Sequence, residues 1–478
     1  MIFSSNIFLC VFLPAFMAAY YLTPQAKRSW TILFGSYLFY AWWRVDFLLL
    51  FVAVTLWNYG FGLKIESANQ RAAKCWVTAG IALNLATLGY FKYANFGVAT
   101  VNAAMTSLGL DPWLLTQVIL PIGISFYIFQ AISYIIDVYR GDTPATRNLV
   151  DFAAFIALFP QLIAGPVLRY KDIAWQFQKR NHSWSNFSEG AQRFMVGFIK
   201  KVVIADTLAP IVDAGFALEN PSTLDAWLAV LAYSAQLYFD FSGYADMAIG
   251  LGLMMGFRFV ENFNQPYISQ SITEFWRRWH ISLSSWLRDY LYIPLGGNRQ
   301  GAKKTYRNLF LTMLLGGLWH GANWTFLVWG AWHGLLLAVE KLLGTATDHK
   351  TSFSPLRCLF TLFLVMLGWV VFRADSIASA TVLYQALFSF DASQLTEVYA
   401  NQVTSLQITT LVLAWAVIFT RGLMQRRKEN GNTSTPTFAL RFPTAYSAIY
   451  AAVLLPLFVA ALLKLSAQSY SAFLYFQF

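Results

Sequence analysis

Apolar runs long enough to cross a lipid bilayer recur along nearly the whole chain, and this pattern restricts its fold most strongly. A helix needs about 20 apolar residues to span the hydrocarbon core of a membrane. Hydrophobic residues make up 57% of the sequence and charged residues only 12%, whereas a soluble domain carries roughly 25% charged residues. We therefore predict an all-α, polytopic integral membrane protein with about eleven transmembrane helices plus interfacial and re-entrant helices. Fourteen apolar runs are found, more than the predicted spans because not every run is expected to cross the bilayer. They cover residues 2–22, 29–43, 47–63, 77–93, 118–139, 151–167, 194–216, 224–239, 242–255, 309–324, 325–343, 356–372, 404–420 and 446–463.

Basic residues between these runs set the expected orientation. Lys27 and Arg28 follow the first run, and positively charged loops stay on the cytoplasmic side, so the N-terminus is predicted to lie outside the cytoplasm. The first run lacks the positive segment that opens a secretory signal, and we expect it to be a retained helix. A basic loop of the C-terminal part, predicted to be cytoplasmic and mobile over about residues 421–437, contains Arg421, Arg426, Arg427 and Lys428.

The remaining charge and the cysteines exclude several classes of protein. The formal net charge of +11 is dispersed between apolar runs, which does not suit a nucleic-acid-binding surface. Cys10, Cys75 and Cys358 have no disulfide or metal-ligand spacing, and we expect them to be small buried hydrophobic side chains. His182 lies in the polar segment 169–186, which we interpret as a cytoplasmic connection with a solvated histidine.

Polar groups gather in residues 238–334, where a membrane protein should have few. This stretch contains three of the five histidines. An ionisable side chain at bilayer depth costs on the order of 3 kcal/mol, so its presence indicates function. The runs 118–139 and 151–167 carry related signs, a polar face in the first and Phe159-Pro-Gln-Leu-Ile-Ala-Gly-Pro166 in the second. Broken backbone at this depth requires protein or a cavity around it.

The segment after residue 261 is less apolar and predicts a different kind of helix. Ser271-Ile-Thr-Glu274 has the form of a capping box, and we predict one helix over residues 272–292. At 100° per residue, His280 falls on its apolar side and is interpreted as facing a substrate path. The alternative is a core histidine bonded to a neighbouring helix, with solvated arginines. The polar side, expected to meet water and an anionic donor, carries Arg277, Arg278 and Arg288.

A second histidine lies in the glycine-rich apolar segment Gly316-Gly-Leu-Trp-His320-Gly-Ala-Asn323. Glycine lets backbone and ligand approach closely. A buried neutral imidazole is suited to act as general base for a hydroxyl that attacks a thioester. We therefore predict a catalytic role for His320, with a structural histidine as the alternative.

The sequence does not predict a metal site. His333 follows His320 by thirteen residues, and on a straight helix their side chains would lie about 220° apart. No cysteine or carboxylate stands at ligand spacing, and no serine-nucleophile elbow, P-loop or dinucleotide motif is found. Asp240 and Asp246 are candidates to polarise a histidine or bind a partner helix, and structural carboxylates are the alternative.

Three motifs taken together resemble the membrane-bound O-acyltransferase family. They read Tyr238-Phe-Asp-Phe-Ser-Gly-Tyr, Glu274-Phe-Trp-Arg-Arg-Trp-His280-Ile-Ser-Leu and Leu318-Trp-His320-Gly-Ala-Asn-Trp. Within that family, the chain is similar to the membrane subunit of bacterial alginate O-acetylation. Phe3-Ser-Ser-Asn-Ile-Phe-Leu, Phe39-Tyr-Ala-Trp-Trp-Arg-Val-Asp46, Ser133-Tyr-Ile-Ile-Asp-Val-Tyr-Arg-Gly-Asp142 and Ile163-Ala-Gly-Pro-Val167 fit this subgroup as well. The resemblance covers residues 1–343.

The resemblance implies a single transmembrane domain over residues 1–478, with helices around a central funnel. It implies that His320 matches the family's histidine and His280 its second polar position. The acetyl group comes from acetyl-CoA or another thioester in the cytoplasm and passes to a periplasmic acetyltransferase partner, with no bound cofactor. The implied place is the bacterial inner membrane. Cellulose, peptidoglycan and teichoic acid are alternative acceptors, and a transporter or flippase is the rival from another class.

The hypothesis assigns a role to each polar residue. His320 activates the acceptor hydroxyl or briefly carries the acetyl group itself, and His280 orients one reactant. We expect Arg277, Arg278 and Arg288 to guide the donor, and Tyr238 and Asp240 to contribute to substrate binding. Asn323 is expected to donate to the developing oxyanion, a role worth about 3 kcal/mol.

Overall fold

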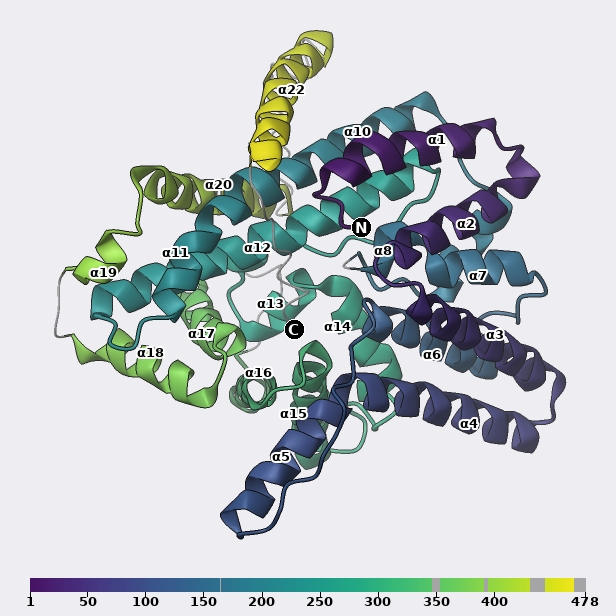
Figure 1. The fold of residues 1–478 in the computed structure, drawn as a ribbon, viewed down its shortest axis with the longest axis horizontal. Coiled ribbons are helices and arrows are strands. Elements are labelled where there is room, and N and C mark those ends of the chain that lie inside the picture. Colours follow the sequence, from purple (N-terminus) through teal and green to yellow (C-terminus); the bar gives the residue numbers. More distant parts are fainter. Residues whose placement is uncertain (164, 346–352, 391–393, 430–442, 468–478) are drawn as a thin grey trace. The chain divides into compact units, whose positions relative to one another are not determined.

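Every regular element of the described chain is helical. The computed structural model describes residues 1–163, 165–345, 353–390, 394–429 and 443–467 (Figure 1). No strand occurs among these residues, which confirms the predicted all-α class.

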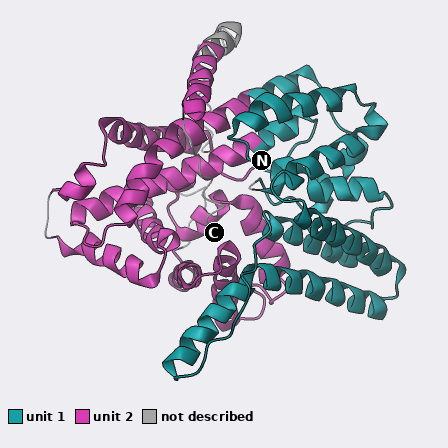
Figure 2. Cartoon of the chain, in the orientation of Figure 1, with its two compact units in different colours: residues 1–191, 248–260 teal, residues 192–247, 261–478 magenta. Residues whose placement is uncertain are grey.

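The chain groups into two compact units (Figure 2). Unit 1 comprises residues 1–191 and 248–260, and unit 2 comprises residues 192–247 and 261–478. The grouping does not test the predicted single transmembrane domain, which stays a prediction. Unit 1 contains η1 (Phe8–Phe12), α1 (Leu13–Leu22), η2 (Gln25–Lys27), α2 (Arg28–Ala41), α3 (Asp46–Ser67), α4 (Gln70–Leu88), η3 (Gly89–Tyr93), α5 (Ala94–Ser107), α6 (Ile124–Arg140), α7 (Leu149–Ala157), α8 (Phe159–Leu162) and α9 (Tyr170–Gln178).

Helices α10 (Trp184–Ile199) and α12 (Thr223–Met254) contribute residues to both units. The other elements belong to unit 2. They are η4 (Lys200–Ala205), α11 (Asp206–Phe216), η5 (Pro266–Ile268), α13 (Ile272–Arg278), α14 (Ile281–Leu287), η6 (Arg288–Tyr292), α15 (Ala302–His320), α16 (Trp324–Leu343), α17 (Pro355–Arg373), α18 (Ile377–Ser389), α19 (Glu397–Ala400), α20 (Ser405–Glu429) and α22 (Pro443–Ala467).

Five of the described helices are long and apolar enough to cross a membrane: α3, α16, α17, α20 and the residues Tyr450–Ala467 of α22. These helices fit a multi-pass membrane protein. By length and composition, the described residues contain fewer candidate spans than the expected number of about eleven, and that number stays a prediction. The predicted run 325–343 matches α16 closely, and the run 356–372 matches α17.

Unit 1 is built around helices α3, α4 and α6, which lie side by side (Figure 1). Asn58 of α3 and Asn84 of α4 are fully buried and exchange amide hydrogen bonds of 2.8 and 3.0 Å. The polar residues that stud α6 are buried, as expected for a face turned to protein. The predicted break in the next run is confirmed, because α7 ends at Ala157 and Pro160 lies in the first turn of α8.

The polar segment 169–186, predicted to be a simple connection, contains regular structure. It contains α9, which the sequence reading missed. His182 is half-buried, and its Nε2 atom lies 2.9 Å from the Tyr20 hydroxyl. The expected solvated histidine is therefore a packed one, and burial together with Arg28 and Arg180 lowers its pKa.

In unit 2, two predicted runs are one helix. The runs 224–239 and 242–255 form the continuous 32-residue α12. A glycine there permits close packing rather than a break, because a methyl group at Gly243 would lie 2.7 Å from the Gly197 carbonyl oxygen. Helices α15 and α16 also pack closely, since a methyl group at Gly330 would lie 2.5 Å from the Met313 carbonyl oxygen.

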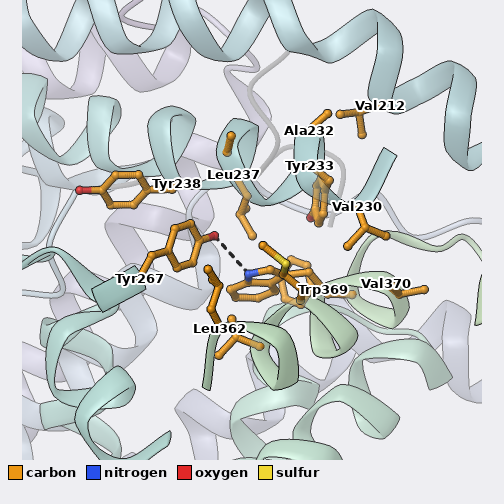
Figure 3. Packing of buried hydrophobic residues seen from close by; sticks show 14 of the residues in the cluster. Val212, Val230, Ala232, Tyr233, Leu237, Tyr238, Tyr267, Leu362, Trp369 and Val370 are labelled. Atoms are coloured by element: carbon orange, nitrogen blue, oxygen red, sulfur yellow. Dashed lines mark hydrogen bonds between the residues drawn. The ribbon is translucent and has the colours of Figure 1, made fainter. Parts of the chain in front are cut away.

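An aromatic and aliphatic core holds the helices of unit 2 together (Figure 3). Trp369 of α17 donates its indole N–H to the Tyr267 hydroxyl at 3.2 Å, which donates in turn to the Ser234 carbonyl oxygen at 2.7 Å. The ring of Trp369 lies 5.0 Å from that of Trp279. This core reaches from α12 and α17 to the residue that precedes His280.

Candidate active site

His280 occupies a sharp break between two short helices. Its backbone is left-handed, with φ of 43° and ψ of 53°. Helix α13 ends two residues earlier, at Arg278, and His280 is the N-cap of α14. Non-glycine residues adopt this conformation rarely, and such strain clusters at functional sites. The single predicted helix over residues 272–292 is therefore wrong, because the hydrogen-bonding ladder is interrupted at Trp279 and His280.

Asn262 holds the start of the second short helix. Its carbonyl oxygen accepts from the Ile281 amide at 3.0 Å. Its side-chain oxygen accepts from the Ser282 hydroxyl at 2.8 Å and from the Ser282 amide at 3.3 Å. These bonds replace those that a continuous helix would supply, and they fix the direction of the His280 side chain.

His320 is the last residue of α15, where Gly321 ends the helix in an extended conformation. The centroids of the His320 and His280 rings lie 6.2 Å apart. His320 is 6% exposed and His280 is 0% exposed. The structure thus brings together the two predicted catalytic residues, from segments 40 residues apart.

Aromatic rings surround this pair. The rings of Trp319, Trp329 and Phe372 lie 5.1, 5.1 and 5.4 Å from that of His320. The Phe241 ring of α12 meets His280 edge-on at 4.7 Å. Such walls exclude water, and this strengthens electrostatic interactions inside the site.

The two ring nitrogens of His280 have no hydrogen-bond partner among the described residues. Burial lowers the pKa of His280 to about 3. Its imidazole is therefore neutral at physiological pH and a weak base. Hydrogen bonding to a reactant suits it better than taking a proton in the rate-determining step.

The three predicted arginines do not form one water-facing row. Arg277 and Arg288 are exposed, and Arg288 pairs with Asp289 at 2.7 Å. Arg278, in contrast, is buried, with Nε 2.9 Å from Glu274 and Nη2 2.7 Å from Glu429. The expectation that Arg278 faces solvent is wrong, because the break at His280 invalidates the helical positions on which it rests.

Arg278 belongs to a buried charge network that joins α13 to α20. Arg426 is 3% exposed and is ion-paired with Glu274. Two arginines and two glutamates thus share one site, which satisfies buried charges by mutual pairing. Arg426 was predicted in a mobile loop, but residues up to Glu429 belong to α20. The rest of that predicted loop, residues 430–437, lies outside the described residues.

The predicted capping box is confirmed for its serine. The Ser271 hydroxyl accepts from the Glu274 amide at 3.0 Å, and Glu274 accepts from the Gln270 amide at 2.9 Å. Glu340 of α16 also caps this helix, accepting at 2.9 Å from both the amide and the hydroxyl of Thr273. A carboxylate at a helix N-terminus is favourable, so both Ser271 and Glu340 hold the N-terminus of α13.

Asn323 is the N-cap of α16. Its side-chain oxygen accepts from the Thr325 amide at 3.2 Å, and its Nδ2 atom donates to the Asp375 carbonyl oxygen at 3.1 Å. In this arrangement the amide that was expected to serve an oxyanion is engaged in holding a helix end.

An Asn323→Ala variant distinguishes these two roles. We expect a loss of about 1 kcal/mol in stability, the usual effect of removing a cap, and a change of less than about threefold in acyl transfer. Loss of an oxyanion donor would reduce kcat by about 10²–10³-fold. Thermal unfolding and initial rates of the purified protein, compared with Asn323→Asp, separate the two results, since aspartate retains the capping oxygen.

The polar residues of α12 have protein partners in unit 2. Asp240 pairs at 2.7 Å with Lys201, which also pairs with Asp206 at 2.7 Å. Asp246 lies 2.6 Å from Lys200. These contacts agree with the structural interpretation of both carboxylates. Tyr238, 5% exposed, donates its hydroxyl to Gln265 at 3.4 Å.

His333 lies on α16, a different helix from His320. Its ring is fully buried among aromatic side chains. Among the residues that the structure describes, no group of three histidine, cysteine or acidic side chains is placed to hold a metal ion. Of the three cysteines, Cys358 is buried, whereas Cys10 and Cys75 are exposed, so the expectation of burial is wrong for these two.

Comparison with known sequences shows to which family of membrane proteins this chain and its pair of buried histidines belong. A profile of the membrane-bound O-acyltransferase family matches residues 143–374, which include His280, His320 and His333. The chain belongs to the membrane-bound O-acyltransferase family, and it is an acyltransferase.

Particular relatives narrow this result. The "Probable alginate O-acetylase AlgI" of Pseudomonas putida is 61% identical over 491 residues, which cover 100% of both chains. The peptidoglycan O-acetyltransferase of Helicobacter pylori is 38% identical over 83% of this chain and 81% of its own. The teichoic acid D-alanyltransferase of Bacillus subtilis is 31% identical over 52% of this chain and 68% of its own. The similarity thus extends beyond residue 343, the predicted limit.

Proposed function

We propose that this protein moves an acetyl group from a cytoplasmic thioester, such as acetyl-CoA, to the outer side of the membrane for O-acetylation of alginate. The observation that carries the proposal is the buried pair His280 and His320, with ring centroids 6.2 Å apart. The full-length similarity to an alginate O-acetylase supports this choice of polymer.

The proposed reaction assigns one role to each histidine. His320 takes the proton of an acceptor hydroxyl as its oxygen attacks the thioester carbonyl carbon. The tetrahedral intermediate then collapses, its carbon–sulfur bond breaks, and the thiolate leaves and takes up a proton. The products are an O-acetyl ester and a free thiol. His280, neutral at physiological pH, orients one reactant by a hydrogen bond.

The donor and acceptor approach from opposite sides in this proposal. About eleven spans around a funnel would give each side access to the site. Arg277 and Arg288 are exposed and suit contact with an anionic donor, although Arg288 also pairs with Asp289 at the surface. Arg278 does not suit this contact, because it is buried and pairs with two glutamates. The acetyl group passes to a periplasmic acetyltransferase partner, in the inner membrane of a bacterium, and the N-terminus faces the periplasm.

Mass spectrometry of exopolysaccharide tests the acceptor. A strain that lacks this protein is expected to make alginate without acetyl groups on its mannuronate units, and the wild-type chain restores them. If alginate keeps its acetyl groups while peptidoglycan loses them, the acceptor is the one named for the Helicobacter pylori relative.

A further inference from the structure

Unit 2 gathers several buried polar atoms without partners beside the histidine pair. The indole N–H groups of Trp276 and Trp329 and both ring nitrogens of His333 have no hydrogen-bond partner among the described residues. Trp276 is 9% exposed, Trp329 1% and His333 0%. Leaving such groups unpaired is unfavourable, so each calls for an explanation.

These three side chains are mutual neighbours. The His333 ring lies 5.2 Å from Trp276 and 5.0 Å from Trp329, and the two indoles lie 5.7 Å apart. Trp329 also lies 5.1 Å from His320. The unpaired atoms therefore belong to one cluster, defined here as Trp276, Trp329 and His333, that adjoins the proposed catalytic residue.

The chemistry of the cluster specifies what it can bind. An indole N–H is a donor only, and a neutral imidazole offers one donor and one acceptor. Phe275 stacks on His333 at 6.2 Å, and Trp369 lies 6.4 Å from it. Apolar aromatic walls disfavour an ion and suit a small uncharged group that presents an acceptor oxygen.

We infer that Trp276, Trp329 and His333 form a subsite that binds the acyl group of the donor. The thioester carbonyl oxygen accepts hydrogen bonds from the cluster, and the methyl group packs on the aromatic faces. This assignment rests on the proposed function, because the donor is the reactant whose neutral carbonyl must lie near His320. It gives His333 a substrate-binding role.

A binding measurement on full-length protein tests the subsite without turnover. His320→Ala serves as the parent, and its affinities for acetyl-CoA and for CoA, which lacks the acyl group, are measured by titration calorimetry. We expect the parent to prefer acetyl-CoA. Adding His333→Phe, which keeps a ring but no nitrogen, is expected to weaken acetyl-CoA binding by about 10-fold and leave CoA binding unchanged.

Stability supplies a second readout. Phenylalanine removes two unpaired buried nitrogens, so the thermal midpoint is expected to stay equal or rise. Loss of acetyl-CoA preference in a protein of undiminished stability supports the subsite. Trp329→Phe is expected to act in the same direction. Trp227→Phe is the matched control, because its indole N–H already donates to the Leu387 carbonyl oxygen at 3.2 Å.

The contrary results are distinct from one another. If His333→Phe leaves the preference for acetyl-CoA intact, or weakens both ligands equally, the subsite is disproved and the proposed function stands. If the parent binds neither ligand, the proposed donor fails, and the subsite fails with it.

Discussion

Replacing His320 with alanine is expected to lower polymer acetylation by at least about 10²-fold, because a positioned general acid–base group contributes about 10²–10⁴-fold to rate. The ring is buried beside His280 and lies against Trp319 and Trp329. A water molecule is therefore not expected to take over proton transfer when the imidazole is removed. Acetyl content is measured in a deletion strain complemented with each variant, with immunoblots of the membrane fraction to establish equal insertion.

His182→Ala is the matched control for this experiment. His182 is a half-buried histidine in unit 1 that bonds to Tyr20, and the proposed reaction does not use it. We expect its loss to leave acetylation within about twofold of wild type, as for most positions away from a site. Normal acetylation by a well-inserted His320→Ala protein would remove the imidazole from the mechanism.

Replacing Arg426 with methionine is expected to destabilise the protein by about 3–5 kcal/mol, since breaking a buried ion pair leaves a charge without its partner. Arg426 and Arg278 both pair with Glu274, and α13 ends at Arg278, two residues before His280. A loosened α13 would misplace His280, so activity is expected to fall together with stability. Thermal midpoint and thioester consumption of detergent-purified protein are the two measurements.

The neighbouring Arg427 provides the control, because it carries the same charge on the same helix but is exposed. Arg427→Met is expected to change stability by less than about 0.5 kcal/mol, as is usual at the surface. Arg426→Lys retains the charge and should recover part of the loss. Equal effects at Arg426 and Arg427 would show that the network contributes nothing particular to α13.

The sequence predicted those features that depend on local pattern. Apolar runs predicted α16 and α17 nearly to the residue. An uninterrupted apolar run of bilayer length usually forms a helix, because a helix satisfies its own backbone hydrogen bonds. Ser271 was identified as a cap from its spacing to Glu274. His280 and His320 were singled out as ionisable groups within apolar sequence, and the structure places their rings together.

Features set by distant contacts could not be predicted in this way. Stepping by 100° assumes an unbroken helix, whereas Asn262 caps α14 from outside it. Charge counting treats arginines as solvated, yet Arg426 pairs with a glutamate 152 residues earlier in the sequence. The sequence was divided into the runs 224–239 and 242–255, but Lys200 and Lys201 pair with Asp246 and Asp240, and α12 continues through both runs.

The cluster of Trp276, Trp329 and His333 was missed for a related reason. Tryptophans in an apolar sequence indicate packing or an interface, and nothing local indicates that their N–H groups lack partners. His333 was considered only as a metal ligand, because the sequence does not show which residues lie near it in the folded protein. The available signal was the spacing of Trp329 and His333, which lie four residues apart and therefore on one face of α16.

The sidedness of acetyl transfer tests the central claim most directly. Proteoliposomes of one orientation would receive acetyl-labelled CoA on the cytoplasmic face only, with the proposed partner, a purified periplasmic acetyltransferase, enclosed on the other side. We expect labelled acetyl groups on the enclosed partner with wild-type protein and none with His320→Ala. Equal labelling with both proteins, or label that stays entirely on the donor side of active vesicles, would contradict a histidine-dependent transfer across the membrane.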